Sequence, residues 1–105
     1  ALILPGAVIN PDGLRTNPAA VALVRASIGA AKPVAAICHG PWLLVEADVL
    51  RGKEATGWKS IRTDLRNAGA MLSEERVVSD GNIITAQAPD DVEAFTEALI
   101  AAVEG

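Results

Sequence analysis

The chain has 105 residues, 50% of them hydrophobic, with a mean hydropathy of +0.31 and a formal net charge of −4. This length fits one globular domain, and the acidic sequence pI of about 4.8 without a cluster of Lys or Arg excludes the basic surface that nucleic-acid binding requires. No apolar run reaches the ~18 residues of a membrane span, and a single cysteine forms no intrachain disulfide, so we expect a cytoplasmic protein that binds neither membranes nor nucleic acid.

The apolar content comes mainly from small and aliphatic residues. Aromatic residues make up 3% of the chain and tyrosine is absent, which favours helices packed closely against a sheet, an α/β class. The sequence opens at Ala1 directly with an apolar run, without an initiator Met or a polar lead-in. We therefore interpret it as a fragment that begins inside a sheet.

The first half of the chain predicts a strand–helix–strand unit. Residues 1–4 and 33–37 are short apolar runs bounded by proline or glycine, which is typical of buried parallel strands. Residues 7–15 predict a loop. Asn17 followed by proline predicts the N-cap of a helix over 18–29.

A second helix is predicted over residues 41–50, directly after the Cys-His-Gly-Pro turn. Residues 53–56 predict a short edge strand. Ser60 is the expected N-cap of a third helix, which ends at Gly69.

The last third predicts a hairpin and a final helix. Asp80-Gly81 is a strong hairpin signal between the apolar runs 76–80 and 82–87. Residues 89–91 predict the start of the final helix, whose expected apolar stripe consists of Val92, Phe95, Leu99 and Val103.

Cys38 and His39 are the only cysteine and the only histidine, and they are adjacent in the run VAAICHGPWLL (34–44). A buried strand that leads Cys38 into a turn opening a helix predicts a nucleophile elbow. The helix N-terminus and a neighbouring imidazolium would both lower the thiol pKa below its free value of about 8.5. Gly40 allows the backbone to approach a substrate, and N–H groups of this turn can hold an oxyanion. The competing interpretation is a buried cysteine that acts only as a small hydrophobe.

The runs AAKPVAAICHGPWLL and RNAGAMLSEERVVSDGNIITAQAPDDVEAF resemble the ThiJ/PfpI superfamily, and in particular its PfpI-type intracellular peptidases and general-stress proteins. The resemblance implies a flavodoxin-like α/β sandwich, related to the class I glutamine amidotransferases. It also implies that residues 1–105 are the C-terminal portion of a single domain whose first strands are missing.

Site roles follow from the same resemblance. Cys38 matches the nucleophile and His39 the histidine after it. Asp12, in Pro-Asp-Gly-Leu-Arg, matches an acid that reaches the histidine of a neighbouring subunit, so a homo-oligomer, dimer or hexamer, is expected. Taken alone, Asp12 is a turn residue.

The backbone of Gly6, Ala7, His39 and Gly40 is expected to form the oxyanion hole, and Trp42 lines the pocket or serves as packing. Trp58 and Met71 are expected only to pack.

Two positions depart from the family pattern. Ala7 replaces a glycine, which narrows or shifts the oxyanion hole, and Gln87 replaces an arginine, which removes a guanidinium. A family glutamate that contacts the sulfur matches no position in this sequence.

The expected function is that of a cysteine-dependent enzyme, a PfpI-type peptidase, deglycase or glyoxalase acting on peptides, glycated groups or small dicarbonyls. No cofactor or metal is expected, because one Cys and one His fall short of a zinc site. The 105 residues alone are expected to be inactive. The alternative is a non-enzymatic redox sensor or holding chaperone of the same superfamily. An amidotransferase mechanism is excluded because it needs a second histidine.

Overall fold

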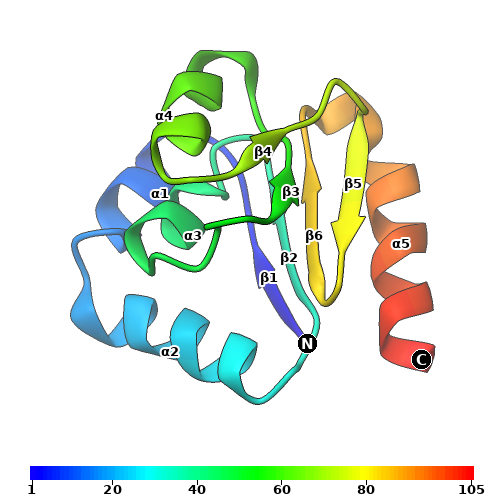
Figure 1. Ribbon diagram of the computed structural model, residues 1–105, viewed down its shortest axis with the longest axis horizontal. Coiled ribbons are helices and arrows are strands. Elements are labelled where there is room, and N and C mark those ends of the chain that lie inside the picture. The colour runs from blue at the N-terminus through cyan, green and yellow to red at the C-terminus, as the bar shows by residue number, and fades with distance from the viewer.

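The computed structural model describes residues 1–105 (Figure 1). Its strands are β1 (Leu2–Leu4), β2 (Val34–Ile37), β3 (Glu54–Ala55), β4 (Met71–Leu72), β5 (Val77–Asp80) and β6 (Ile83–Ala86). Its helices are α1 (Ile9–Leu14), α2 (Pro18–Gly29), α3 (Trp42–Glu46), α4 (Arg62–Asn67) and α5 (Val92–Glu104), with 3-10 turns η1 (Lys59–Ile61) and η2 (Pro89–Asp91). No helix is long and apolar enough to cross a membrane.

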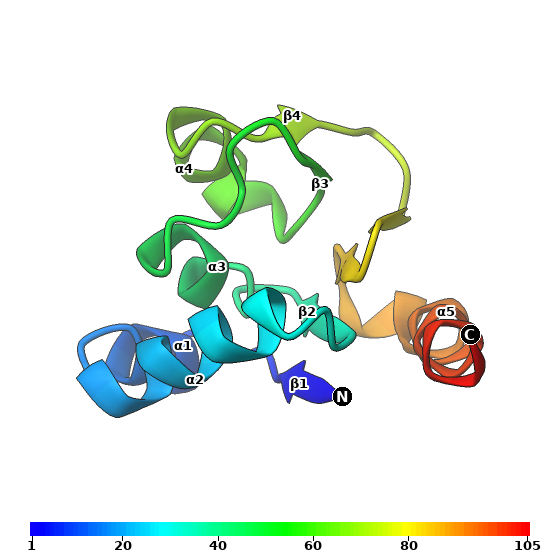
Figure 2. The ribbon, with the colours of Figure 1, turned by 60° about the horizontal axis from the view of Figure 1, so that its bottom comes forward.

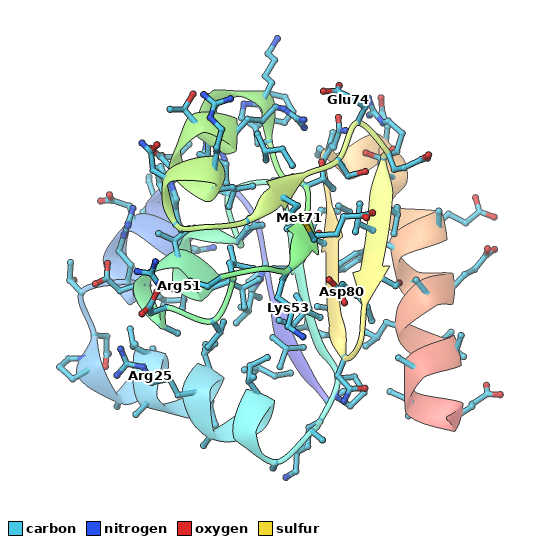
Figure 3. The ribbon with its side chains drawn as sticks, in the orientation of Figure 1. Arg25, Arg51, Lys53, Met71, Glu74 and Asp80 are labelled. Atoms are coloured by element: carbon cyan, nitrogen blue, oxygen red, sulfur yellow. The ribbon has the colours of Figure 1, made fainter.

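Four strands form the main sheet in the order β1-β2-β6-β5. β1, β2 and β6 are mutually parallel, and β5 pairs antiparallel with β6. β3 and β4 form a separate two-stranded parallel pair, tied to β5 where the Glu54 N–H donates to Asp80 Oδ2 at 2.8 Å. Figure 3 shows Asp80 on β5 facing this pair. The expected edge strand at 53–56 is therefore present, but outside the main sheet.

Helices lie on both faces of the main sheet, α2 and α3 on one side and α5 on the other, while α4 packs against α3 and β4 (Figure 2). The strand period of two produces this division, because successive side chains point to opposite faces. Val34 and Ala36 belong to the larger core beneath α2 and α3, whereas Ala35 packs with Phe95 and Leu99 of α5. The α/β class and the parallel strand pair predicted from the sequence are confirmed.

Two local predictions are confirmed in detail. The Asn17 side chain accepts from the backbone N–H groups of Ala19 and Ala20 at 2.9 and 3.3 Å and so caps α2. The hairpin turns through Gly81, whose φ of +60° suits glycine.

Other expectations were wrong because tertiary contacts decided them. Residues 9–14, expected as loop, form α1, whose Pro11 is buried. α3 ends at Glu46, and the chain turns at Asp48 with a φ of +57°. Of the stripe expected on α5, Val92 and Val103 are exposed, since the helix rests on the sheet only through its middle.

Ser60 does not cap a helix as expected. α4 begins two residues later, at Arg62, and its N-cap residue Ile61 forms no side-chain cap hydrogen bond. Met71 was also wrongly expected to pack, since this residue of β4, labelled in Figure 3, is 56% exposed. The Ser60 hydroxyl is therefore free to contact another part of the chain.

Candidate active site

Cys38 lies directly after β2 in a strained backbone conformation. Its φ of +59° is in the left-handed region, which costs a residue with a Cβ about 1–2 kcal/mol. The surrounding structure holds it there, because the Cys38 N–H donates to the Ala86 carbonyl at 3.1 Å and its carbonyl accepts from the Trp58 N–H at 2.8 Å. The predicted strand–turn–helix geometry is confirmed, and Cys38 stands in the strained conformation within it.

Two glycines allow the chain to pack closely around this turn. A Cβ on Gly40 would lie 2.4 Å from the Leu4 carbonyl oxygen, and a Cβ on Gly6 would lie 2.8 Å from the Cys38 Cβ. The end of β1 and the loop after it are therefore pressed against the elbow. Glycine is needed at both positions because a Cβ would clash with neighbouring atoms. Backbone conformation is not the reason, since neither glycine has a positive φ.

The oxyanion donors need one correction. The Gly40 N–H donates to the Ile37 carbonyl at 2.8 Å, so the turn itself uses this donor. The N–H groups of Gly6, Ala7 and His39 donate to no acceptor in the chain and stay candidates. Ala7 has a φ of +62°, so the alanine at this position adopts the backbone conformation that a glycine would take without strain.

A small cavity of about 190 Å³ opens over the sulfur. It is lined by Ala7, Cys38, His39, Trp58 and Pro89. Trp58, expected only to pack, forms part of this wall, whereas Trp42 does not line it. The sequence provided no sign that Trp58 and not Trp42 lines the cavity, because Trp58 comes from the loop after β3, a segment without a recognisable motif.

His39 is 8% exposed and lies among aromatic rings. Its ring centroid is 5.1 Å from that of Trp42 in an edge-on arrangement and 6.2 Å from that of Trp58. Ser60 Oγ lies 3.3 Å from His39 Nε2. Trp42 thus contacts His39 without lining the cavity. The Trp42 Nε1–H donates to Asp64 Oδ2 at 3.1 Å.

Asp12 is not brought to His39 within the chain. It lies on α1 with an exposed side chain that forms no hydrogen bond or ion pair. The structure therefore brings Cys38, His39, Ala7 and Gly6 together and leaves Asp12 at the surface.

A second cavity, of about 260 Å³, shares Trp58 with the first. Lys59, Arg76 and Gln87 also line it. Arg76 is paired with Asp91 at 2.9 Å. The sequence predicted that Gln87 leaves this region without a guanidinium, but Arg76 lines the same cavity as Gln87. The two residues are adjacent, since the Gln87 N–H donates to the Arg76 carbonyl at 3.1 Å.

The largest cavity does not suggest a second catalytic site, and the acidic residues do not suggest a metal site. That cavity, of about 380 Å³, has a wall of mixed charge that includes Arg15, Asp48, Arg51 and Asp64, and neither Cys38 nor His39 lines it. No group of three or more His, Cys, Asp or Glu side chains could hold a metal ion.

The thiol of Cys38 is not activated in the way its sequence context suggested. Burial raises the pKa of the Cys38 thiol above its ordinary value, and the negative charge of Asp91 raises it further. This direction is opposite to the lowering expected from the sequence, because burial and the Asp91 carboxylate both disfavour the charged thiolate. The thiolate is therefore stabilised neither by burial nor by the charge of Asp91.

We predict that Asp91→Asn speeds iodoacetamide alkylation of Cys38 at pH 7.5. Removing the carboxylate charge lowers the thiol pKa, and the thiolate is the species that reacts. The rate is measured on folded protein by mass spectrometry. Asp90→Asn is the matched control, because Asp90 has no effect on the Cys38 pKa. Equal rates for Asp91→Asn and the unaltered chain would contradict the assignment.

The fold has three α/β layers. Cys38 lies at a left-handed turn between a strand and a helix, next to His39, and both residues line a cavity. These features define an α/β protein with a candidate cysteine nucleophile. Residues 1–102 match the DJ-1/PfpI family, and the chain belongs to it.

Three relatives illustrate the family. The chain is 47% identical over 95 residues to "Putative cysteine protease YraA" of Bacillus subtilis (90% of this chain, 56% of the relative). It is 44% identical over 105 residues to general stress protein 18 of the same organism (99% and 60%). It is 46% identical over 101 residues to protein/nucleic acid deglycase 2 of Escherichia coli (94% and 58%). The chain thus spans a little over half the length of these relatives.

Solved structures show the same architecture. The chain superposes with a TM-score of 0.94 and 44% identity on a two-domain protein from Anabaena variabilis that contains DJ-1/ThiJ/PfpI-like and ferritin-like domains, covering 97% of this chain and 29% of that one. The expected flavodoxin-like fold is therefore confirmed.

Proposed function

We propose that this protein is a cysteine-dependent stress-response enzyme of the PfpI type, a peptidase, deglycase or glyoxalase that acts on peptides, glycated groups or small dicarbonyls such as methylglyoxal. The observation that carries the proposal is the strained elbow that holds Cys38 at a cavity beside His39. The names of the relatives, a cysteine protease, a deglycase and a general stress protein, support it. A redox sensor is less well supported, because such a thiol has a low pKa and that of Cys38 is raised.

The raised thiol pKa favours a general-base mechanism. In hydrolysis, the sulfur attacks the carbon of the substrate carbonyl as its proton moves to the His39 imidazole, and the proton then passes to the leaving group, so that a thioester remains on Cys38. Water then attacks this thioester, His39 takes the proton of the water, and the C–S bond breaks as the sulfur regains a proton. The free N–H groups of Ala7, Gly6 and His39 are the donors for the oxyanion. In the free chain no hydrogen bond joins the sulfur and the ring, so the proton transfer requires the geometry of the substrate complex.

A substrate panel tests the proposal. The full-length protein, of which residues 1–105 are expected to be the C-terminal portion, is assayed with methylglyoxal, a glycated peptide and a fluorogenic peptide, before and after alkylation of Cys38 to one equivalent with iodoacetamide. We expect turnover of at least one substrate, and its loss on alkylation. Turnover that survives alkylation, or none with any substrate, would overturn the proposal.

Asp12 is proposed to orient His39 of a second copy of the chain. Support comes from the surface around it, because Val8 and Ile9, which precede it, are 51% and 85% exposed. An apolar patch beside an unpaired carboxylate suits a self-association surface. A homo-oligomer would cover the patch and bring Asp12 to a neighbouring site.

Asp12→Asn is predicted to lower turnover about tenfold, less than the roughly 100-fold or more that a direct acid or base contributes, because Asp12 only orients His39, and to leave the fold intact. The fold is retained because the Asp12 side chain is exposed and makes no contact with its own chain through hydrogen bonds. Turnover and light scattering are measured together, with Glu97→Gln on α5 as the exposed control. A fully active monomer would refute the role of Asp12.

A further inference from the structure

We propose that Ser60 is a positioning residue for His39, which fixes the imidazole from within the same chain. Ser60 Oγ lies 3.3 Å from His39 Nε2 and comes from η1, which is 21 residues further along the chain. The inference rests on the proposed function, since it assigns a role beside the same histidine.

The surroundings of His39 make this contact the main polar constraint on the ring. The histidine is 8% exposed, and Trp42 and Trp58 contact it with apolar ring surface. A buried ring nitrogen without a hydrogen-bond partner is costly, and no buried side-chain nitrogen or oxygen in the chain lacks one. Ser60 supplies the side-chain partner of this nitrogen.

A hydroxyl is suited to a group that exchanges protons. It can accept from a protonated Nε2 or donate to an unprotonated one, so the contact persists through the proton transfers of catalysis. Because an imidazole has two nitrogens, the contact leaves Nδ1 of His39 available to the thiol or the substrate. A carboxylate from a second copy, such as Asp12, would have to share Nε2 with Ser60.

The position of Ser60 is itself fixed by the fold. Trp58, two residues before it, is hydrogen-bonded to the backbone of Cys38: the Trp58 N–H donates to the Cys38 carbonyl at 2.8 Å. The Ile61 N–H donates back to the Trp58 carbonyl at 3.0 Å and closes η1. The elbow and the hydroxyl are therefore parts of one rigid unit, which is why the serine can set the orientation of the ring.

Two cationic side chains lie against the tryptophans that contact His39. Arg15 lies 5.2 Å from the Trp42 ring centroid, and Lys59 lies 5.7 Å from that of Trp58. Asp64 accepts from the Trp42 indole. None of these forms a hydrogen bond with His39, so Ser60 is the polar side chain that does.

The test combines kinetics with NMR of the ring. In 15N-labelled protein, the ring signals of His39 are assigned by their loss in His39→Asn, and Ser60→Ala, Ser60→Thr and the exposed control Ser79→Ala are compared at a pH where imidazole is neutral. We expect Ser60→Ala to change the two ring 15N shifts and to lower kcat about tenfold with KM within about twofold. Ser60→Thr, which keeps the hydroxyl, should recover most of kcat, and Ser79→Ala should change nothing.

Unchanged ring shifts in Ser60→Ala would overturn the inference, as would altered shifts with an unaltered kcat. If Ser60→Ala does not fold, Ser60→Thr and Ser60→Cys decide, because the proposal requires the threonine to exceed the cysteine in kcat. If the protein shows no turnover that depends on Cys38, the proposed function fails, and the ring shifts still decide whether Ser60 fixes His39.

Discussion

Replacing Gly40 by alanine is expected to destabilise the protein by about 3 kcal/mol or more, close to the upper range for a single substitution. The new Cβ would lie 2.4 Å from the Leu4 carbonyl oxygen and 2.9 Å from that of Ile37. Both are backbone atoms at the ends of β1 and β2, so no side chain can rotate away. The strands must separate at the elbow, and the free energy of unfolding measured in urea should fall accordingly.

Gly29→Ala is the matched control. Gly29 is the last residue of α2, and a Cβ there would meet nothing within 4 Å. Alanine in a helix is favoured over glycine by about 0.5–1 kcal/mol, so this variant should be as stable as the unaltered chain or slightly more so. Equal stability of Gly40→Ala and Gly29→Ala would show that the elbow is looser than the structure indicates.

Gly6→Ala is expected to lower turnover about 100-fold while leaving the chain folded, since a displacement of about 1 Å at a reacting group has an effect of that size. The added Cβ would lie 2.8 Å from the Cys38 Cβ and 3.2 Å from its sulfur. The side chain that must move is the nucleophile itself. The stability cost should stay below that of Gly40→Ala, because the shortest contact of the added Cβ is 2.8 Å at Gly6 and 2.4 Å at Gly40.

Turnover, urea unfolding and the alkylation rate of Cys38 are measured together for this variant. Gly13→Ala, on α1, serves as the control because a Cβ there has open space around it. If Gly6→Ala keeps full turnover, Cys38 does not need the geometry seen here, and its assignment as the nucleophile loses its main structural support.

The local sequence determined much of the framework. The apolar runs before and after α2, the Asn17 cap and the hairpin at Gly81 all form as predicted. Each depends on residues only a few positions apart, so strand burial, capping and turn formation can be inferred without knowing the fold. The elbow at Cys38 belongs to this group, because a strand that leads into a glycine-containing turn is itself a local pattern.

The tertiary structure decided how the site is completed. Whether Trp42 or Trp58 lines the cavity, and whether Ser60 caps a helix or contacts His39, depends on how the segment after β3 folds back on the elbow. The direction of the Cys38 pKa depends on burial and on Asp91, which follows β6 far along the chain. Hydrogen bonds, desolvation and charge act between segments that are distant in sequence and close in space. The local sequence therefore predicted Cys38 as the candidate nucleophile, and only the fold determined the surroundings of its thiol.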